Sequence, residues 1–309
     1  MVTDSSRDRV LRKRHANHVT VIQHTAGNPE RYRVLVPYLI EPFTRALSTF
    51  LPYEKAFDRV FAVFSLLLLV ALLWSQFAYL RRWFTEQEAL IGCLVVATTM
   101  AINLQQPYAL WSHLESIFAA LLFLLILDDR RILIGVVIAL ASLNRETAIF
   151  LVMMYAVTAP LSVRNAATTL VYLGIWAAIY LGLRAWLGMD LHLYRPGTWQ
   201  INLIPINMAT SAVNALLFLG AFWIFAAMGV RRAPPLVRRS AIIVPIYLAF
   251  FTQAQWWEVR PFMTLYPILL PLALSYLLTA RPVPLTREEC RAGRGNHATA
   301  GQLAAASPA

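Results

Sequence analysis

Residues 132–159 read ILIGVVIALASLNRETAIFLVMMYAVTA, and this stretch places a charged pair, Arg145 and Glu146, between two apolar runs. On insertion scales an ionised side chain at the centre of a membrane costs on the order of 3 kcal/mol, so such residues usually face a partner, a cavity or the interface. We therefore predict a helix before the motif and another after it, with a substrate-binding site at Asn144, Arg145 and Glu146. The alternative is one long, kinked helix over residues 132–159, which would invert part of the topology.

The composition is that of a membrane protein. Hydrophobic residues make up 59% of the 309 positions and charged residues 14%, whereas soluble domains are nearer half apolar and a quarter charged. The net charge of +11 raises the question of a nucleic-acid partner. However, the basic residues stand at the ends of apolar runs, as topology signals and lipid-headgroup contacts do. We therefore expect a membrane lipid partner and no nucleic acid.

The apolar blocks approach the length of about 20 residues that a transmembrane helix needs. We predict an all-α, polytopic fold with about eight or nine transmembrane helices over residues 31–279. Residues 1–30 form a polar, basic arm without the apolar core of a signal peptide, and residues 280–309 form a disordered tail. The predicted spans are Val60–Leu80, Leu90–Asn103, Leu114–Leu127, Ile132–Leu143, Thr147–Leu161, Thr168–Leu187, Ala209–Val230, Ala241–Thr252 and Phe262–Leu278.

The arginines predict the orientation of these spans. Four of them lie in the short loop 231–239, which the positive-inside rule places in the cytoplasm. Alternation then puts the loops 105–116, 144–146, 189–202 and 253–260 outside. The basic arm also falls outside, which is an exception to the rule. Because the chain is rich in arginine and has only two lysines, a composition typical of GC-rich bacteria, we expect a bacterial inner membrane with the site facing the periplasm or exterior.

The segment Leu35–Leu51 has an amphipathic pattern. Apolar residues recur at helical spacing, and four polar residues fall on the opposite side. This pattern predicts a helix that lies in the membrane interface with its apolar face towards the lipid. An ordinary core helix is the alternative. The apolar stripe consists of Leu35, Leu39, Phe43, Leu47 and Phe50, and the polar residues are Glu41, Thr44, Arg45 and Ser48.

Two polar groups lie before predicted helices on the external side. In Glu30-Arg31-Tyr32-Arg33, two arginines flank a tyrosine and are suited to clamp a phosphate; contact with lipid headgroups explains them equally well. The second group is Trp111–Ser116. In it, His113 or Glu115 could take a proton from an acceptor hydroxyl. Alternatively, Glu115 only stabilises the start of its helix.

The remaining candidate residues lie in two predicted external loops, at 144–146 and at 253–260. Arg145 keeps its charge at any accessible pH and needs an anion, for which Glu146 and a lipid phosphate are the two candidates. Trp256 and Trp257 mark an interface and can stack on sugar rings. Glu258 and Arg260 are two residues apart and would point to opposite sides of an extended chain. The sequence indicates no metal site, although a divalent metal cofactor stays open.

Four of these segments resemble GT-C membrane glycosyltransferases. Asp129–Thr147 is similar to a basic loop followed by a short helix that ends in a Lys/Arg-x-Thr-like motif. His113–Ser116 resembles the acidic residue that opens a helix in protein mannosyltransferases and aminoarabinose transferases. Glu258–Pro267 resembles their late Glu/Arg-Tyr segment, and Leu35–Leu51 their juxtamembrane helix. The resemblance implies transfer of a sugar from a polyprenyl-phosphate carrier to an acceptor glycan, lipid or protein at the external face.

The resemblance also implies roles for single residues. Arg145, with Arg33 and Arg260, would contact the carrier phosphate, and Glu115 would be a polar site residue. The family's catalytic carboxylate lies between a first span and the juxtamembrane helix, where this chain offers only Glu30. We predict Glu30 and Glu115 as catalytic residues, and the substrate-binding residues as Tyr32, Arg33, His113, Asn144, Arg145, Glu146, Trp256, Trp257, Glu258 and Arg260.

Three alternatives to this assignment stay open. The catalytic carboxylate lies in sequence upstream of Met1, the protein is an inactive GT-C-like chain, or the protein is a lipid or sugar transporter or flippase. A transporter should show inverted repeats and helices broken near the middle of the membrane, and no repeat is apparent in the sequence.

Overall fold

The structure of the protein is a computed structural model that describes residues 6–103, 110–189, 198–251, 258 and 260–278. Every regular element within these residues is a helix, so the predicted all-α class is confirmed. The predicted tail at 280–309 lies outside the described residues.

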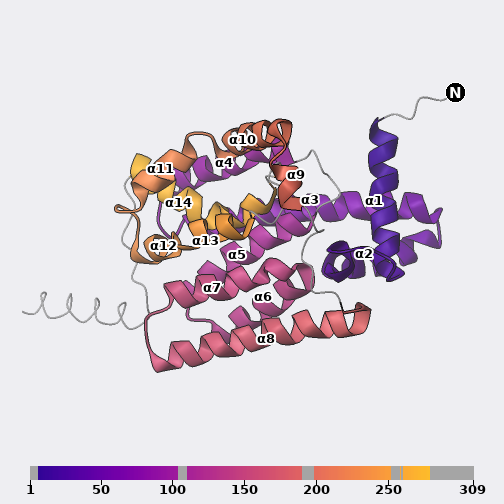
Figure 1. Cartoon of the computed structure of the whole chain (residues 1–309), viewed down its shortest axis with the longest axis horizontal. Helices are drawn as coiled ribbons and strands as arrows, with labels where there is room; N and C mark the ends of the chain where they lie inside the picture. The colour runs from indigo at the N-terminus through magenta and orange to yellow at the C-terminus, as the bar shows by residue number, and fades with distance from the viewer. Residues whose placement is uncertain (1–5, 104–109, 190–197, 252–257, 259, 279–309) are drawn as a thin grey trace, which may run out of the picture.

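The N-terminal part of the chain forms a compact corner of the molecule, at the right of Figure 1. It contains α1 (Ser6–Ile22), the short 3-10 helix η1 (Glu30–Tyr32), α2 (Leu35–Ser48) and the long helix α3 (Tyr53–Leu80). α1 packs against η1, α2 and α3. The polar arm is therefore helical over most of its length and is joined to the rest of the fold.

The central helices lie side by side and carry the predicted motif (Figure 1). They are α5 (Trp111–Leu127), α6 (Arg131–Asn144), η2 (Glu146–Ala148), α7 (Ile149–Thr158) and α8 (Val163–Leu187). α5 packs against α3 and α6, and both α6 and α7 pack against α8. The C-terminus of α8 is held by η1, because Arg31 donates to the carbonyl of Leu187 and Tyr32 donates to that of Gly188.

The remaining helices form the opposite side of the molecule, at the top of Figure 1. They are α4 (Glu86–Asn103), α9 (Thr198–Asn202), α10 (Pro205–Leu219), α11 (Phe222–Gly229), α12 (Pro235–Ser240), α13 (Ile243–Phe251), η3 (Arg260–Leu265) and α14 (Tyr266–Leu277). α11 and α14 pack closely at Gly229, where an added Cβ would lie 1.9 Å from the carbonyl oxygen of Leu272. Glycine is needed there because the two backbones touch.

The charged motif breaks the helix as predicted. α6 ends at Asn144, Arg145 is extended with φ −164° and ψ 145°, and η2 begins at Glu146. The alternative of one long helix over 132–159 was wrong. The break is local, because an extended residue interrupts the i to i−4 hydrogen-bond pattern that would continue the helix.

Fewer helices than predicted are long enough to cross a membrane. Within the described residues, α3 and α8 meet the requirements of length and apolarity, and α10 with α11 is a third candidate, bent by 65°. Other apolar helices are shorter: α6 has 14 residues, which span about 21 Å against a hydrocarbon core of about 30 Å. The prediction of eight or nine spans counted apolar blocks in the sequence. Most of those blocks form helices that are too short to cross the hydrocarbon core on their own.

The outer surface is unusually apolar for a protein in water. α3 exposes Leu66, Leu67 and Trp74 by about 60% each, and the short helix α6 exposes Ile132 and Leu133. Soluble monomers rarely present contiguous apolar surface of this extent. The exposed faces therefore fit contact with lipid on short helices as well as long ones.

α2 is amphipathic in the sense that the sequence predicted, and its apolar face points outwards. Phe43 is 67% exposed and Phe50, just beyond the helix, is 85% exposed. Glu41 and Thr44, from the polar side, are buried against the protein. Val36 and Ile40, which widen the apolar stripe, are buried in the core, and Arg45 of the polar side is exposed, so the packed helix stays an alternative.

The helix ends that carry the predicted cytoplasmic arginines are joined to one another. Arg82 after α3 forms two hydrogen bonds of 2.9 and 3.0 Å with Asp128 after α5. Arg131 at the start of α6 donates to Thr168 in the first turns of α8. Arg239 of α12 donates to the carbonyl of Thr158 at the end of α7. In each contact, residues near the ends of two helices meet on the same side of the fold, as they do when neighbouring helices are antiparallel.

Candidate functional site

The centre of the candidate site is a buried ion pair between α5 and the break after α6. The Nη1 atom of Arg145 lies 2.9 Å from Oε2 of Glu115, and both side chains are nearly inaccessible. The hydroxyl of Thr147 donates to the other oxygen of the Glu115 carboxylate. Arg145 thus forms an ion pair with Glu115 of a neighbouring helix, and it also interacts electrostatically with the adjacent Glu146, the internal partner that the sequence offered.

A second buried ion pair lies beside the first. Nη2 of Arg33, which follows η1, is 3.2 Å from Oε1 of Glu146, and these side chains are 7% and 4% exposed. The Arg33 guanidinium also lies over the Trp111 ring at 5.3 Å. Because Glu146 follows Arg145 directly, the two pairs form one continuous polar group between η1, α5, α6 and η2.

The backbone around these pairs is fixed by side-chain hydrogen bonds. The Asn144 amide donates to the carbonyl of Trp111 over 2.9 Å, which joins the end of α6 to the start of α5. The Trp176 indole of α8 donates to the carbonyl of Glu146 over 3.1 Å. Both bonds join the motif to a neighbouring helix through a backbone carbonyl. The motif is therefore held in place by α5 and α8.

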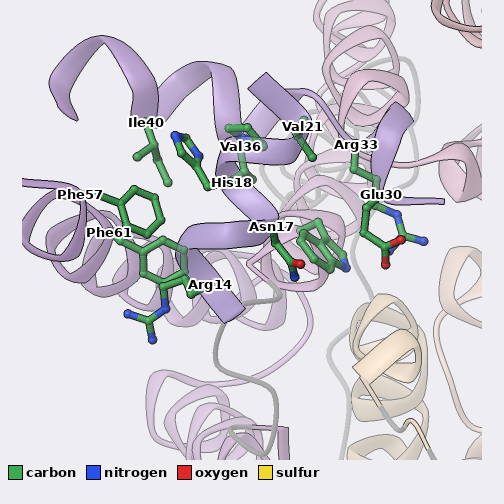
Figure 2. Close-up of a pocket in the computed structure, with 12 residues that line it drawn as sticks. Arg14, Asn17, His18, Val21, Glu30, Arg33, Val36, Ile40, Phe57 and Phe61 are labelled. Atoms are coloured by element: carbon green, nitrogen blue, oxygen red, sulfur yellow. The ribbon is translucent and has the colours of Figure 1, made fainter. Parts of the chain in front are cut away.

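Arg33 also lies in the wall of a pocket that opens to solvent. Figure 2 shows Glu30 and Arg33 together on one side of it, with Phe57 and Phe61 of α3 on the other. α1 supplies Arg14, Asn17, His18 and Val21, and α2 supplies Val36, Pro37 and Ile40; Trp111 completes the lining. The pocket thus combines guanidinium groups, polar groups and aromatic rings.

Two arginines of this pocket have unused hydrogen-bonding capacity. The Nε atoms of Arg14 and Arg33 are buried and have no acceptor among the residues that the structure describes. The Arg14 guanidinium lies 4.1 Å from the centre of the Phe61 ring, and burial lowers its pKa against a smaller raising effect of Asp58. A buried donor without an acceptor costs about 1–3 kcal/mol. An anion in the pocket would supply the missing acceptor.

Other predicted site residues are placed elsewhere. Tyr32 is buried against α8, with its ring 4.3 Å from the Arg184 guanidinium. His113 is half-buried in the first turn of α5 and is not part of the pocket lining. Arg260 lies 2.9 Å from Glu258, so the chain bends there and the two side chains meet instead of pointing apart. Trp256 and Trp257 lie outside the described residues.

Sequence reasoning missed the contribution of α1. Arg14, Asn17, His18 and Val21 line one side of the pocket and are spaced three, one and three residues apart, which places them on one face of a helix. That spacing was the available signal. The pocket that these side chains line could not be predicted from the spacing, because its other walls come from α2, α3 and α5.

No three His, Cys, Asp or Glu side chains come together as a metal site within the described part of the chain. Comparisons with protein-family models, curated proteins and solved structures found no match. The candidate site therefore has to be interpreted from its own chemistry.

Proposed function

We propose that the protein is a polytopic membrane glycosyltransferase that moves a sugar from a polyprenyl-phosphate-linked donor to an acceptor hydroxyl at the external membrane face. One observation carries the proposal: the pocket beside the exposed apolar face of α2 has two buried guanidinium Nε–H groups without an acceptor among the described residues. A carrier lipid can keep its chain in the membrane while its phosphate enters this pocket.

The phosphate is assigned to Arg33, whereas Arg14 lies beside Phe61 on the other side of the pocket (Figure 2). A guanidinium binds phosphate oxygens in a planar, two-pronged geometry and keeps its charge throughout the reaction. Glu146 lies 3.2 Å from Arg33, so it holds the guanidinium in place before the phosphate binds. Fixed positive charge beside the departing phosphate stabilises the transition state without reorganisation, which is often the largest electrostatic contribution to catalysis.

The sugar is assigned to the aromatic and carboxylate part of the lining. Trp111 presents a ring in the pocket, and Glu30 lies 4.0 Å from Arg33 with 40% of its side chain exposed. Glu30 is the carboxylate that the family resemblance predicts, and its place suits a hydrogen bond to the sugar or to the acceptor hydroxyl. In the reaction, the acceptor oxygen bonds to the anomeric carbon, the bond from that carbon to the phosphate oxygen breaks, and its electron pair leaves with the phosphate.

Glu115 and Arg145 are assigned a positioning role. The Glu115 carboxylate is bound on one oxygen by Arg145 and on the other by Thr147, and it is not part of the pocket lining. The pair fixes the break after α6 and hence Glu146, which in turn orients Arg33.

The membrane arrangement belongs to the same proposal. We infer eight or nine membrane-embedded helices, with the arginine-rich ends in the cytoplasm of a bacterial cell and the pocket facing outwards. Exposed apolar side chains on the short helix α6 support contact with lipid along helices that do not span the membrane alone. Short helices are tolerated where neighbouring protein covers their ends.

The test uses the full-length protein in liposomes with radiolabelled short-chain polyprenyl-phosphate sugars and a mixture of hydroxyl acceptors. Arg33→Gln should reduce sugar transfer on the order of 100-fold, as loss of an electrostatic contact in the transition state does. Arg31→Gln is the matched control, because Arg31 donates to the carbonyls of Ala26 and Leu187 outside the pocket, and it should stay within about threefold of wild type, the range of small energetic effects. Full activity of Arg33→Gln would reject the assignment.

A transporter or flippase is the second candidate, because the bend of 65° between α10 and α11 gives the chain one broken apolar helix, a feature of transporter cores. The same liposomes separate the two functions. Movement of the intact labelled lipid between leaflets, without release of its sugar, would favour the transporter.

A further inference from the structure

The strongest feature that the proposed function leaves unused is a buried histidine in the pocket wall. His18 of α1 is 6% exposed, and its Nε2 atom lies 2.8 Å from Oε2 of Glu41 on α2. The imidazole also packs on the Phe57 ring of α3, with 4.7 Å between ring centres. Three helices therefore fix the orientation of this ring.

Glu41 is itself held by two further donors. The Tyr53 hydroxyl donates to Oε2 over 2.6 Å, and Nε of Arg45 donates to Oε1 over 2.7 Å. Burial alone would raise the Glu41 pKa, but hydrogen bonds from Tyr53, Arg45 and His18 outweigh it and lower the pKa. Glu41 is thus an oriented anion. An imidazole hydrogen-bonded to such a carboxylate is the arrangement by which a general base is oriented and its protonated form stabilised.

The hydrogen bond also determines which nitrogen can accept a proton. With an ionised carboxylate as its partner, Nε2 carries the hydrogen and donates it, so Nδ1 holds the lone pair. Among the residues that the structure describes, Nδ1 has no hydrogen-bond partner. His18 lines the same pocket as Glu30 and Arg33 (Figure 2).

On the basis of the proposed transferase function, we propose that His18, oriented by Glu41, accepts the proton of the acceptor hydroxyl. The O–H bond breaks as the acceptor oxygen bonds to the anomeric carbon, and the proton moves to Nδ1 of His18. The imidazolium that results is stabilised by the Glu41 carboxylate, and the phosphate leaves as an anion. The arm thereby contributes a reacting group from outside the segment that resembles GT-C enzymes.

The surroundings of His18 favour the neutral imidazole that a base requires. Burial lowers its pKa from 6.5, against the raising effect of Glu41, and His15 on the same helix lowers it slightly further. The other charged groups of the pocket are Arg14, Arg33 and Glu30, and Arg45 faces the far oxygen of Glu41. Burial therefore favours the neutral form of the imidazole, which is the form that can accept a proton.

The experiment compares His18→Gln with His15→Gln in the liposome transfer assay. Glutamine can place its amide nitrogen near the position of Nε2 and keep the bond to Glu41, so a purely structural role survives the change while proton acceptance does not. His15 is the matched control, because it lies on the same helix and contacts the same Phe57 ring but is not part of the pocket lining. Thermal unfolding of both variants checks that they are folded.

We expect His18→Gln to lose on the order of 100-fold in kcat, the usual contribution of a general base, while binding of the unreacted carrier lipid is unchanged. The acidic limb of the wild-type pH profile should disappear in this variant. Imidazole added to His18→Gly should restore part of the activity. Transfer by His18→Gln within about threefold of His15→Gln, the range of small energetic effects, would overturn the proposal. Absence of transfer by the wild-type protein would instead reject the function itself, so the two failures are distinguishable.

Discussion

Two buried carboxylates, Glu115 and Glu41, are held by similar numbers of partners and yet have different surroundings. Glu115 lies between α5, α6 and η2, where Arg145 and Thr147 occupy its two oxygens. Glu41 lies on the buried side of α2, where it binds Tyr53, Arg45 and His18, and His18 lines a solvent-open pocket. The charged partner of Glu115 is an arginine alone, whereas Glu41 binds an arginine and also an imidazole, which can gain or lose a proton.

The difference shows how burial can serve structure in one place and chemistry in another. Arginine cannot release its proton, so the pair with Glu115 can position a chain break but cannot move protons. Histidine can, and its carboxylate partner makes the protonated form accessible. Substitutions at these positions should separate the two cases, most strongly where a permanent charge loses its partner.

Removal of Glu115 should have the largest effect on stability. Glu115→Ala leaves the Arg145 guanidinium buried without its carboxylate, and breaking a buried ion pair in this way costs about 3–5 kcal/mol. We expect a correspondingly large decrease in the free energy of unfolding in detergent. Thr147→Val removes one hydrogen bond to the same carboxylate and should cost less, about 1.5–3 kcal/mol. Equal losses in both variants would contradict a dominant role for the ion pair.

Removal of Glu41 should lower the free energy of unfolding by less than removal of Glu115, because one partner of Glu41, Arg45, is exposed to solvent. Glu41→Ala loses two sheltered hydrogen bonds, and we expect about 2–3 kcal/mol of destabilisation. The Arg45 side chain is 71% exposed, so water and salt screen its charge and Arg45→Ala should destabilise the fold much less. The same unfolding measurement compares them. An Arg45→Ala loss as large as that of Glu41→Ala would show that the exposed pair, rather than the buried bonds, anchors α2.

The pH dependence of unfolding should separate the two carboxylate groups further. Because the pKa of His18 is lowered from 6.5 in the folded protein, the unfolded chain binds more protons just below pH 6.5. Stability is therefore full above pH 6.5 and decreases on acidification, by at most about 1.4 kcal/mol for each pH unit between the unfolded and folded pKa of His18. The lowered pKa of Glu41 adds a second loss below its ordinary value of 4.5.

His18→Gln should remove the first of these losses and keep the second. Thermal unfolding of both proteins at a pH about one unit above 6.5 and at a pH between 4.5 and 6.5 provides the measurement, because the difference between the two proteins isolates the contribution of His18. A wild-type stability that is the same at both values would contradict the direction assigned to the His18 pKa.

The smallest effect on stability is expected at the outer face of α2. Phe43 is exposed, so Phe43→Cys with a nitroxide label should change the free energy of unfolding by no more than about 0.5 kcal/mol. In a protein without Cys93 and Cys290, the label should be accessible to membrane-dissolved oxygen. A label at Lys13 of α1 is the control and should be accessible to a water-soluble relaxation agent. The reverse pattern would place α2 in water.

The positions of the helices were largely predictable, because helix boundaries depend on neighbouring residues. The predicted span Val60–Leu80 ends where α3 ends, and the break at Arg145 follows from three consecutive polar residues between apolar runs. The number of complete spans was not predictable in the same way. The sequence shows where an apolar run begins and ends. Whether a short apolar helix has its ends covered by neighbouring protein depends on how the helices pack.

The sequence alone determined an all-helical, strongly apolar chain, a charged break after α6 and an apolar stripe on α2, since each depends on residues within a few turns of one another. Only the tertiary structure decided which charges meet. Arg145 pairs with Glu115 across 30 positions and Arg33 with Glu146 across 113, and His18 of the arm reaches Glu41. Buried charges require partners of opposite sign, but the choice among them depends on how the helices pack.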